Sequence, residues 1–176
     1  MKCPTCIYDE CEDDFCLRYD NYQKRKASKM MRETKTWDQT FMNLALSIAH
    51  DRSKDNSTQV GCVLVDEHKD PVAFGYNGFG PGAEETDELW TRPEKYDHVI
   101  HAEANAVGRA ARRGCSTQGC TAYLTVFCCL PCAKALISAG IVRVVALRLL
   151  GHWDESHTKA AKELKRCGVD YEIWNE

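Results

Sequence analysis

The sequence predicts an α/β domain in which helices pack on one twisted sheet. Short β-branched and apolar runs alternate with segments of helical periodicity from residue 37 onward. A chain of 176 residues can bury a full core, roughly 70% of the surface that the unfolded chain exposes. The 11 cysteines are about 6% of the residues, which is below the level of a disulfide scaffold. We therefore predict metal ligation or catalysis, more than disulfide formation, as the role of these cysteines.

The first predicted elements are a helix and a hairpin. Apolar residues recur at helical spacing in the segment that starts at Trp37, and Asp38 favours an N-terminal turn there. The apolar run at residues 61–65 predicts a buried strand, and residues 72–76 are expected to form a second strand. The polar link between the two strands suits a hairpin.

Residues 77–98 show no sustained period, which predicts a long loop, and loops of this length are usually functional. The remaining elements alternate, which predicts parallel neighbours joined by right-handed crossovers. The expected helices are 102–113, 133–139 and 155–167, and the expected strands are 121–127, 142–147 and 169–174.

Residues 1–36 differ in composition from the domain that follows at 37–176. Four cysteines lie in the first sixteen residues, and a basic stretch precedes residue 36. Four thiols in so short a segment suit a second, structural zinc site, and the alternative is a reduced tail without metal. The four residues are Cys3, Cys6, Cys11 and Cys16.

Charge and hydropathy restrict the function classes. Acidic residues outnumber basic ones 26 to 23, which argues against a nucleic-acid-coating protein but allows a small anionic substrate. No apolar run approaches the roughly 18 residues of a membrane span. The first residues, MKCPTCIYDE, lack the apolar stretch of a signal peptide, so we expect a cytoplasmic protein.

Two short motifs carry the chemistry. His101 precedes one predicted helix, and Cys129 and Cys132 surround the start of another, where free backbone N–H groups stabilise thiolates. One imidazole and two thiolates leave one tetrahedral zinc position open for water, as in catalytic sites. Glu103 stands two residues after the histidine and can move protons without binding the metal. A Cys-x-x-Cys motif alone is often structural, and a His-x-Glu motif alone is common by chance. Together they match the signature of zinc nucleobase deaminases.

Further stretches make the resemblance more specific. Residues 37–174 resemble the deoxycytidylate (dCMP) deaminases. The matching segments are Arg52-Ser53-Lys54-Asp55, Gln59-Val60-Gly61, Gly75-Tyr76-Asn77-Gly78, His101-Ala102-Glu103 with Asn105-Ala106, Tyr123-Leu124-Thr125 and Cys132-Ala133-Lys134. The resemblance implies a three-layer α/β/α sandwich with a mixed five-stranded sheet, of the cytidine-deaminase-like type. It also implies hydrolytic deamination of dCMP to dUMP, which supplies thymidylate synthesis.

The resemblance also suggests substrate contacts. Asn77 resembles the family residue that hydrogen-bonds the nucleotide sugar. Ser53, with Arg52 or Lys54, can receive the 5′-phosphate through charge-assisted bonds, and the alternative for these cations is a solvated helix end. Arg112 lies about three turns after His101 and suits an effector or subunit contact, with an exposed helix arginine as the alternative.

Two departures from the family pattern bear on the site. Cys128 stands where the family usually has proline, so an extra thiol lies beside the predicted ligand Cys129. Residues 151–154 lack the expected tyrosine-containing pattern, which leaves deamination of a 5-modified dCMP or of dCTP open. A nucleic-acid cytosine deaminase or editing module is a further alternative, and the net acidity weighs against it. From the resemblance alone we also expect a homo-oligomer, in the family a hexamer, with dCTP and dTTP effectors and magnesium.

Overall fold

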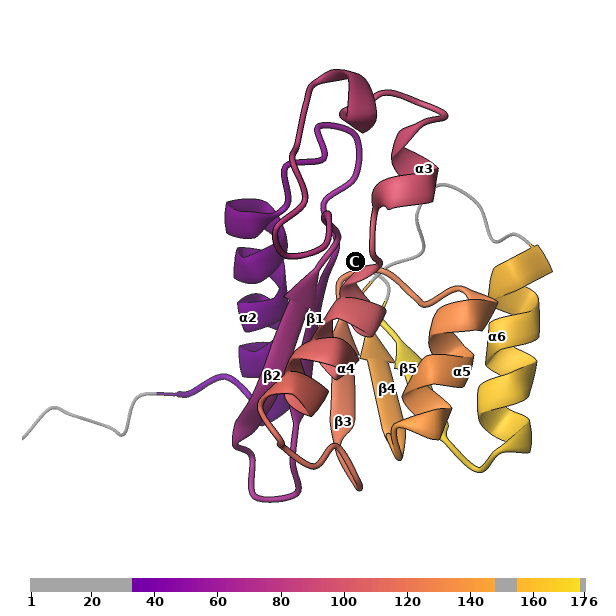
Figure 1. Ribbon diagram of the computed structural model, residues 1–176. Coiled ribbons are helices and arrows are strands. Elements are labelled where there is room, and N and C mark those ends of the chain that lie inside the picture. The colour runs from indigo at the N-terminus through magenta and orange to yellow at the C-terminus, as the bar shows by residue number, and fades with distance from the viewer. Residues whose placement is uncertain (1–32, 148–154, 175–176) are drawn as a thin grey trace, which may run out of the picture. The chain divides into compact units, whose positions relative to one another are not determined.

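A mixed five-stranded sheet forms the centre of the computed structural model, which describes residues 33–147 and 155–174. The strand order is β2-β1-β3-β4-β5 (Figure 1). β1 (Gly61–Val65) pairs antiparallel with both β2 (Pro71–Tyr76) and β3 (Thr121–Leu124), so the predicted hairpin is confirmed. β4 (Arg143–Ala146) and β5 (Asp170–Ile173) extend the sheet in parallel from β3.

Helices cover both faces of this sheet, which makes three layers (Figure 1). α2 (Trp37–Arg52) lies on one face. α4 (Ala102–Arg112), α5 (Leu130–Ser138) and α6 (Glu155–Arg166) lie on the other. The predicted three-layer sandwich with a mixed sheet is therefore confirmed. None of the described helices is long and apolar enough to cross a membrane.

The alternation of side chains along β1 explains why two cores form. Successive side chains of a strand point to opposite faces of the sheet. Cys62 and Leu64 accordingly join the core beneath α4, α5 and α6, while Val63 and Val65 join the core beneath α2. All five residues of β1 are buried, as expected for a central strand covered on both faces.

The segment predicted as one long loop is more ordered than expected. It contains a 3₁₀ helix, η1 (Glu88–Trp90), and a short helix, α3 (Lys95–His98). Phe79 stacks on Trp90 with ring centroids 4.5 Å apart, and a backbone bridge between Gly78 and Ile100 closes the base of the segment. The short helices were missed because these contacts are not helical repeats in the sequence.

Two element boundaries near the candidate ligands differ from the prediction. The strand expected to reach residue 127 ends at Leu124, because the next residue, Thr125, binds Gly61 through both its backbone and its hydroxyl. The helix expected at residue 133 begins at Leu130, because Pro131 fits the first helical turn, where its missing N–H costs nothing. The earlier start makes Cys129 the residue that immediately precedes α5.

Candidate functional site

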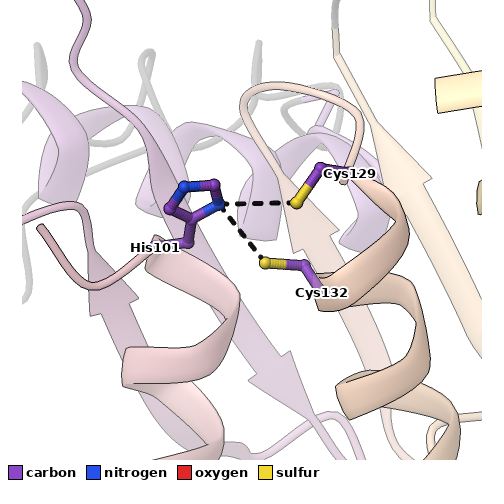
Figure 2. A group of neighbouring side chains, drawn as sticks. All are labelled: His101, Cys129 and Cys132. Atoms are coloured by element: carbon purple, nitrogen blue, oxygen red, sulfur yellow. Dashed lines mark hydrogen bonds between the residues drawn. The ribbon is translucent and has the colours of Figure 1, made fainter. Parts of the chain in front are cut away.

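The two predicted motifs meet where α4 and α5 begin. His101 is the N-cap residue of α4 and Cys129 is the N-cap residue of α5, and neither side chain caps its own helix. At the start of α5, the backbone N–H of Leu130 donates to the Ser156 hydroxyl at 3.0 Å and so needs no bond from Cys129. Both ligand side chains are therefore available to face each other (Figure 2).

The distances between the three side chains fit a tetrahedral zinc ion. His101 Nδ1 lies 3.5 Å from Cys129 Sγ and 3.4 Å from Cys132 Sγ. Zinc bonds of about 2.05 Å to nitrogen and about 2.3 Å to sulfur, at a tetrahedral angle, place these atoms about 3.6 Å apart. His101, Cys129 and Cys132 form the one His/Cys/Asp/Glu group with metal-binding geometry among the described residues.

The two thiols share one proton, and Cys129 is the one that favours the thiolate. The Cys132 thiol donates to Cys129, and this hydrogen bond lowers the pKa of Cys129, while the same bond raises the pKa of Cys132. His101 further favours the Cys129 thiolate. A cation bound by both sulfurs would replace the proton that they share, because the thiolate is the metal-binding form. The donor set thus fits zinc with one coordination position open to water.

Glu103 lies in the first turn of α4, beside the metal-binding group. Its side chain is buried, with 4% of the residue exposed. Burial raises the pKa of this carboxyl above its usual value, although its own backbone N–H and His101 oppose the rise. A carboxyl with a raised pKa holds a proton more strongly than a free carboxyl does, which suits a group that accepts a proton and then donates it.

Cys128 does not join this group. Its side chain is buried in the core beneath α4, α5 and α6, and burial raises the pKa of its thiol. The metal-binding group consists of His101, Cys129 and Cys132 and does not include Cys128. Cys128, which stands where the family usually has proline, is therefore a small apolar core residue.

A cavity of about 330 Å³ opens beside the candidate ligands. His101, Glu103 and Cys129 line part of its wall, and Val60 and Phe127 supply apolar surface. Small-ligand sites typically combine an apolar wall with a few polar groups in this way. The cavity is thus a suitable place for a flat base next to the metal.

Asn77 lines the same cavity and also ties the neighbouring segments together. Its Oδ1 accepts the Val60 N–H at 2.8 Å and the Ser53 hydroxyl at 2.7 Å. Its Nδ2 donates to the Thr58 carbonyl at 2.8 Å. Since the residue is 6% exposed, its orientation is held firmly by these three bonds.

The other predicted substrate residues do not line the cavity. Ser53 faces Asn77, as described above. Arg52 lies over the Tyr76 ring, 5.9 Å from its centroid, and Lys54 pairs with Glu85 at 3.2 Å. Arg112 is exposed on the last turn of α4. The roles predicted for these residues remain predictions.

Three further charged residues line the cavity, and sequence reasoning gave none of them a role in the site. They are Asp55, Arg92 and Lys95, of which the last two come from the segment 77–98. The length of that segment signalled a functional role, but the sequence did not indicate which of its many charges turn inward.

Comparison with known proteins identifies the family. Residues 35–148 match the model of the cytidine and deoxycytidylate deaminase zinc-binding region. The chain belongs to this family. The matched region is a zinc-binding one, which agrees with the zinc ligands expected at His101, Cys129 and Cys132. The prediction of a zinc-dependent hydrolytic deaminase is therefore confirmed at the level of family and enzyme class.

Curated relatives and a solved structure agree with this assignment. The mouse deoxycytidylate deaminase is 36% identical over 141 residues, which cover 77% of this chain and 78% of that protein. The human deoxycytidylate deaminase is 33% identical with the same coverage. The crystal structure of dCMP deaminase from the cyanophage S-TIM5 in complex with dCMP and dUMP gives a TM-score of 0.66 at 24% identity. It covers 81% of this chain and 99% of the phage chain, which supports the fold.

Two sequence predictions lie outside the described residues. These are the second metal site at Cys3, Cys6, Cys11 and Cys16, and the departure from the family pattern at residues 151–154. The predicted boundary between residues 36 and 37 also stays a prediction.

Proposed function

We propose that this protein converts dCMP and water to dUMP and ammonia in a zinc-dependent hydrolysis. The observation that carries the proposal is the arrangement of one imidazole nitrogen and two sulfurs around a common point, with the Glu103 carboxyl buried beside them. The curated deoxycytidylate deaminases at 33–36% identity support the choice of a deoxycytidine monophosphate. Ligand thiols need a reducing compartment, which supports the cytoplasm as the place of action.

The three ligands and the cavity divide the task between them. Zinc bound by His101, Cys129 and Cys132 would lower the pKa of a water molecule toward neutrality and so prepare it for attack. The apolar surface of Val60 and Phe127 would hold the cytosine ring and exclude bulk water. The ring is then positioned with its C4 toward the metal-binding group.

Glu103 moves the protons. Its carboxylate accepts a proton from the attacking water and passes it to N3 of cytosine, while the water oxygen bonds to C4. Glu103 then delivers the second proton to the amino nitrogen, the C4–N bond breaks, and ammonia leaves. The atoms balance, because one water molecule enters and the ring gains a carbonyl oxygen in place of the amino group.

The sugar contact is assigned to Asn77. Its burial and its place in the cavity wall support this role, and Ser53 supports it indirectly by holding the Asn77 side chain. For the 5′-phosphate, the sequence favours Arg52 or Lys54 with Ser53, although none of these residues lines the cavity.

Other family properties belong to the same proposal. Cys3, Cys6, Cys11 and Cys16 would hold a second zinc ion. Arg112, exposed at the end of α4, would contact an effector or a neighbouring subunit of a homo-oligomer such as a hexamer. Magnesium with dCTP or dTTP would act as the effector.

The test is turnover of a substrate panel by the zinc-loaded protein. Ammonia release would be measured with dCMP, 5-methyl-dCMP, dCTP, deoxycytidine and single-stranded DNA, and zinc would be counted on the same preparation. Preferred turnover of dCMP supports the proposal. Turnover of DNA without turnover of free nucleotides would overturn it and favour an editing enzyme.

A further inference from the structure

Two cations enter the cavity from the segment that precedes α4. They are Arg92 and Lys95, and the cavity also contains one carboxylate beside them, that of Asp55. α3, which carries Lys95, lies over the end of the sheet where α4 and α5 begin (Figure 1). This charged group is therefore part of the same cavity as the metal ligands.

The charge of Lys95 is already neutralised. Its Nζ lies 2.7 Å from Asp55 Oδ2, and the two side chains are 5% and 7% exposed. The other oxygen of Asp55 accepts the Ser57 hydroxyl at 2.7 Å and the backbone N–H groups of Ser57 and Thr58 at 2.9 and 3.2 Å. Both oxygens of the Asp55 carboxylate are thus bonded within the protein, so the ion pair is a fixed part of the cavity wall.

Ser57 links Arg92 to this pair. Its hydroxyl donates to Asp55, and it accepts from Lys95 Nζ at 2.7 Å and from Arg92 Nη2 at 3.4 Å. The two cationic nitrogens therefore lie no more than about 6 Å apart. Oxygens of one bound anion can reach both nitrogens at this spacing.

Arg92 brings a positive charge that pairs with no carboxylate of the described residues. Within residues 33–147 and 155–174, no ion pair involves Arg92, and its guanidinium lies 5.9 Å from the centroid of the Tyr96 ring. Contact with an aromatic ring leaves the N–H groups at the edge of the guanidinium able to donate. A planar fork of donors at the edge of a cavity is the geometry that binds phosphate oxygens in pairs.

We propose that Arg92 binds the 5′-phosphate of the substrate and that the Asp55–Lys95–Ser57 group positions it. The inference rests on the proposed function and adds its phosphate-binding residue. It also replaces the expectation from the sequence that Arg52 or Lys54 binds the phosphate. Arg52 contacts Tyr76 and Lys54 pairs with Glu85, and none of these residues lines the cavity.

The test compares substrates with and without the phosphate. Arg92→Gln, Arg92→Lys and the control Arg166→Gln would be assayed with dCMP and with deoxycytidine. Arg166 is exposed on α6 and pairs with Glu163, so its replacement changes the same charge away from the cavity. The double variant Arg52→Gln/Lys54→Gln tests the rival phosphate site.

We expect Arg92→Gln to raise KM for dCMP about 10- to 100-fold, the effect of losing charge-assisted hydrogen bonds. Turnover of deoxycytidine and the zinc content should stay at the wild-type level, and Arg92→Lys should recover part of the loss. Binding of the product dUMP, measured by calorimetry, should weaken in parallel, whereas binding of deoxyuridine should not change. The control variant should match the wild type throughout.

The outcomes separate the two proposals. A wild-type protein that does not deaminate dCMP overturns the proposed function itself. A wild-type protein that prefers dCMP to deoxycytidine, together with an Arg92→Gln variant that keeps the full preference, overturns the role of Arg92 alone. Loss of the preference in Arg52→Gln/Lys54→Gln, with Arg92→Gln unaffected, would move the phosphate to the sequence-predicted site.

Discussion

His101 and Cys129 hold the same position on two different helices, and their side chains meet across 3.5 Å instead of capping those helices. The first turns of α4 and α5 are thereby brought together at the metal-binding group. Because helix N-termini favour negative charge, the position of Cys129 before α5 favours its thiolate, whose pKa is lowered by the Cys132 thiol and by His101. One helix start supplies Cys132 and the other supplies Glu103, so ligand and proton carrier come from the same two turns.

Substitutions can distinguish the role of a metal ligand from that of the proton carrier. Glu103→Gln should keep the zinc content and lower kcat about 10²- to 10⁴-fold, since the amide cannot accept the proton of water. Cys132→Ala should lose one zinc equivalent relative to the wild type and lose turnover as well. Metal analysis and ammonia release on the same samples give both results. Cys167→Ala, which removes an exposed thiol, is the control, and a Gln variant with near-normal turnover would remove Glu103 from its role.

Cys128 tests whether the extra thiol competes for the metal. We expect Cys128→Ala to keep the wild-type zinc content, because its side chain lies in the core and outside the metal-binding group. The lost sulfur should lower the free energy of unfolding by about 1 kcal/mol through the small cavity that remains. Zinc analysis and chemical denaturation would be measured together. A drop of one zinc equivalent would show that Cys128 is a ligand.

The buried pair of Asp55 and Lys95 should be costly to break. Asp55→Ala leaves the Lys95 ammonium buried without its partner, which lowers the free energy of unfolding by about 3–5 kcal/mol. Replacing both residues, as in Asp55→Leu/Lys95→Met, should cost much less, because no buried charge remains unpaired. Chemical denaturation of the zinc-loaded variants measures both values. Equal losses in the single and the double variant would contradict an interaction between the two side chains.

Acid should destabilise the fold partly through Asp38. Hydrogen bonds from Arg143 and Tyr123 lower the pKa of this carboxyl below its usual 3.8, against the effect of burial. A carboxyl with a folded-state pKa below its unfolded value contributes stability above the unfolded value, and it loses that contribution as the pH falls through the folded value. The stability of the wild type should therefore decline below about pH 4 more steeply than that of Asp38→Asn. Denaturant unfolding between pH 3 and pH 7 would reveal parallel curves if Asp38 contributed nothing.

Local spacing explains which parts of this molecule were predictable. Cys129 and Cys132 are three residues apart, so one helical turn determines their relation, and His101 and Glu103 share another first turn. The order of strands and helices followed in the same way from short periodic runs. These are relations within a few residues of chain.

Relations between distant residues were not accessible in this way. Lys95 and Asp55 are 40 residues apart, and Arg143 meets Asp38 across 105 residues. Asp38 lies in the first turn of its helix, as expected, but its bond to Arg143 and the cap formed by Thr36 and Gln39 emerged only from the structure. The charged wall of the cavity depends on such contacts, which is why it emerged only from the structure.

Gly75 provides the last test, because it determines how closely α4 lies on β2. A Cβ atom at Gly75 would lie 2.1 Å from the Ala102 carbonyl oxygen and 2.5 Å from the Ala106 nitrogen, and both are backbone atoms of α4. Gly75→Ala should therefore push α4 outward, lower the free energy of unfolding by about 1–3 kcal/mol, and reduce turnover by moving His101 and Glu103 from their positions.

The matched control is Gly108→Ala on the same helix, where a Cβ meets no atom within 4 Å. This change should raise the free energy of unfolding by about 0.5–1 kcal/mol, since alanine favours the helix interior over glycine, and should leave turnover unchanged. Denaturant unfolding and ammonia release would be measured on both variants. If Gly75→Ala matched the wild type in both measurements, the close packing of α4 on β2 would not be what holds the two helix starts together.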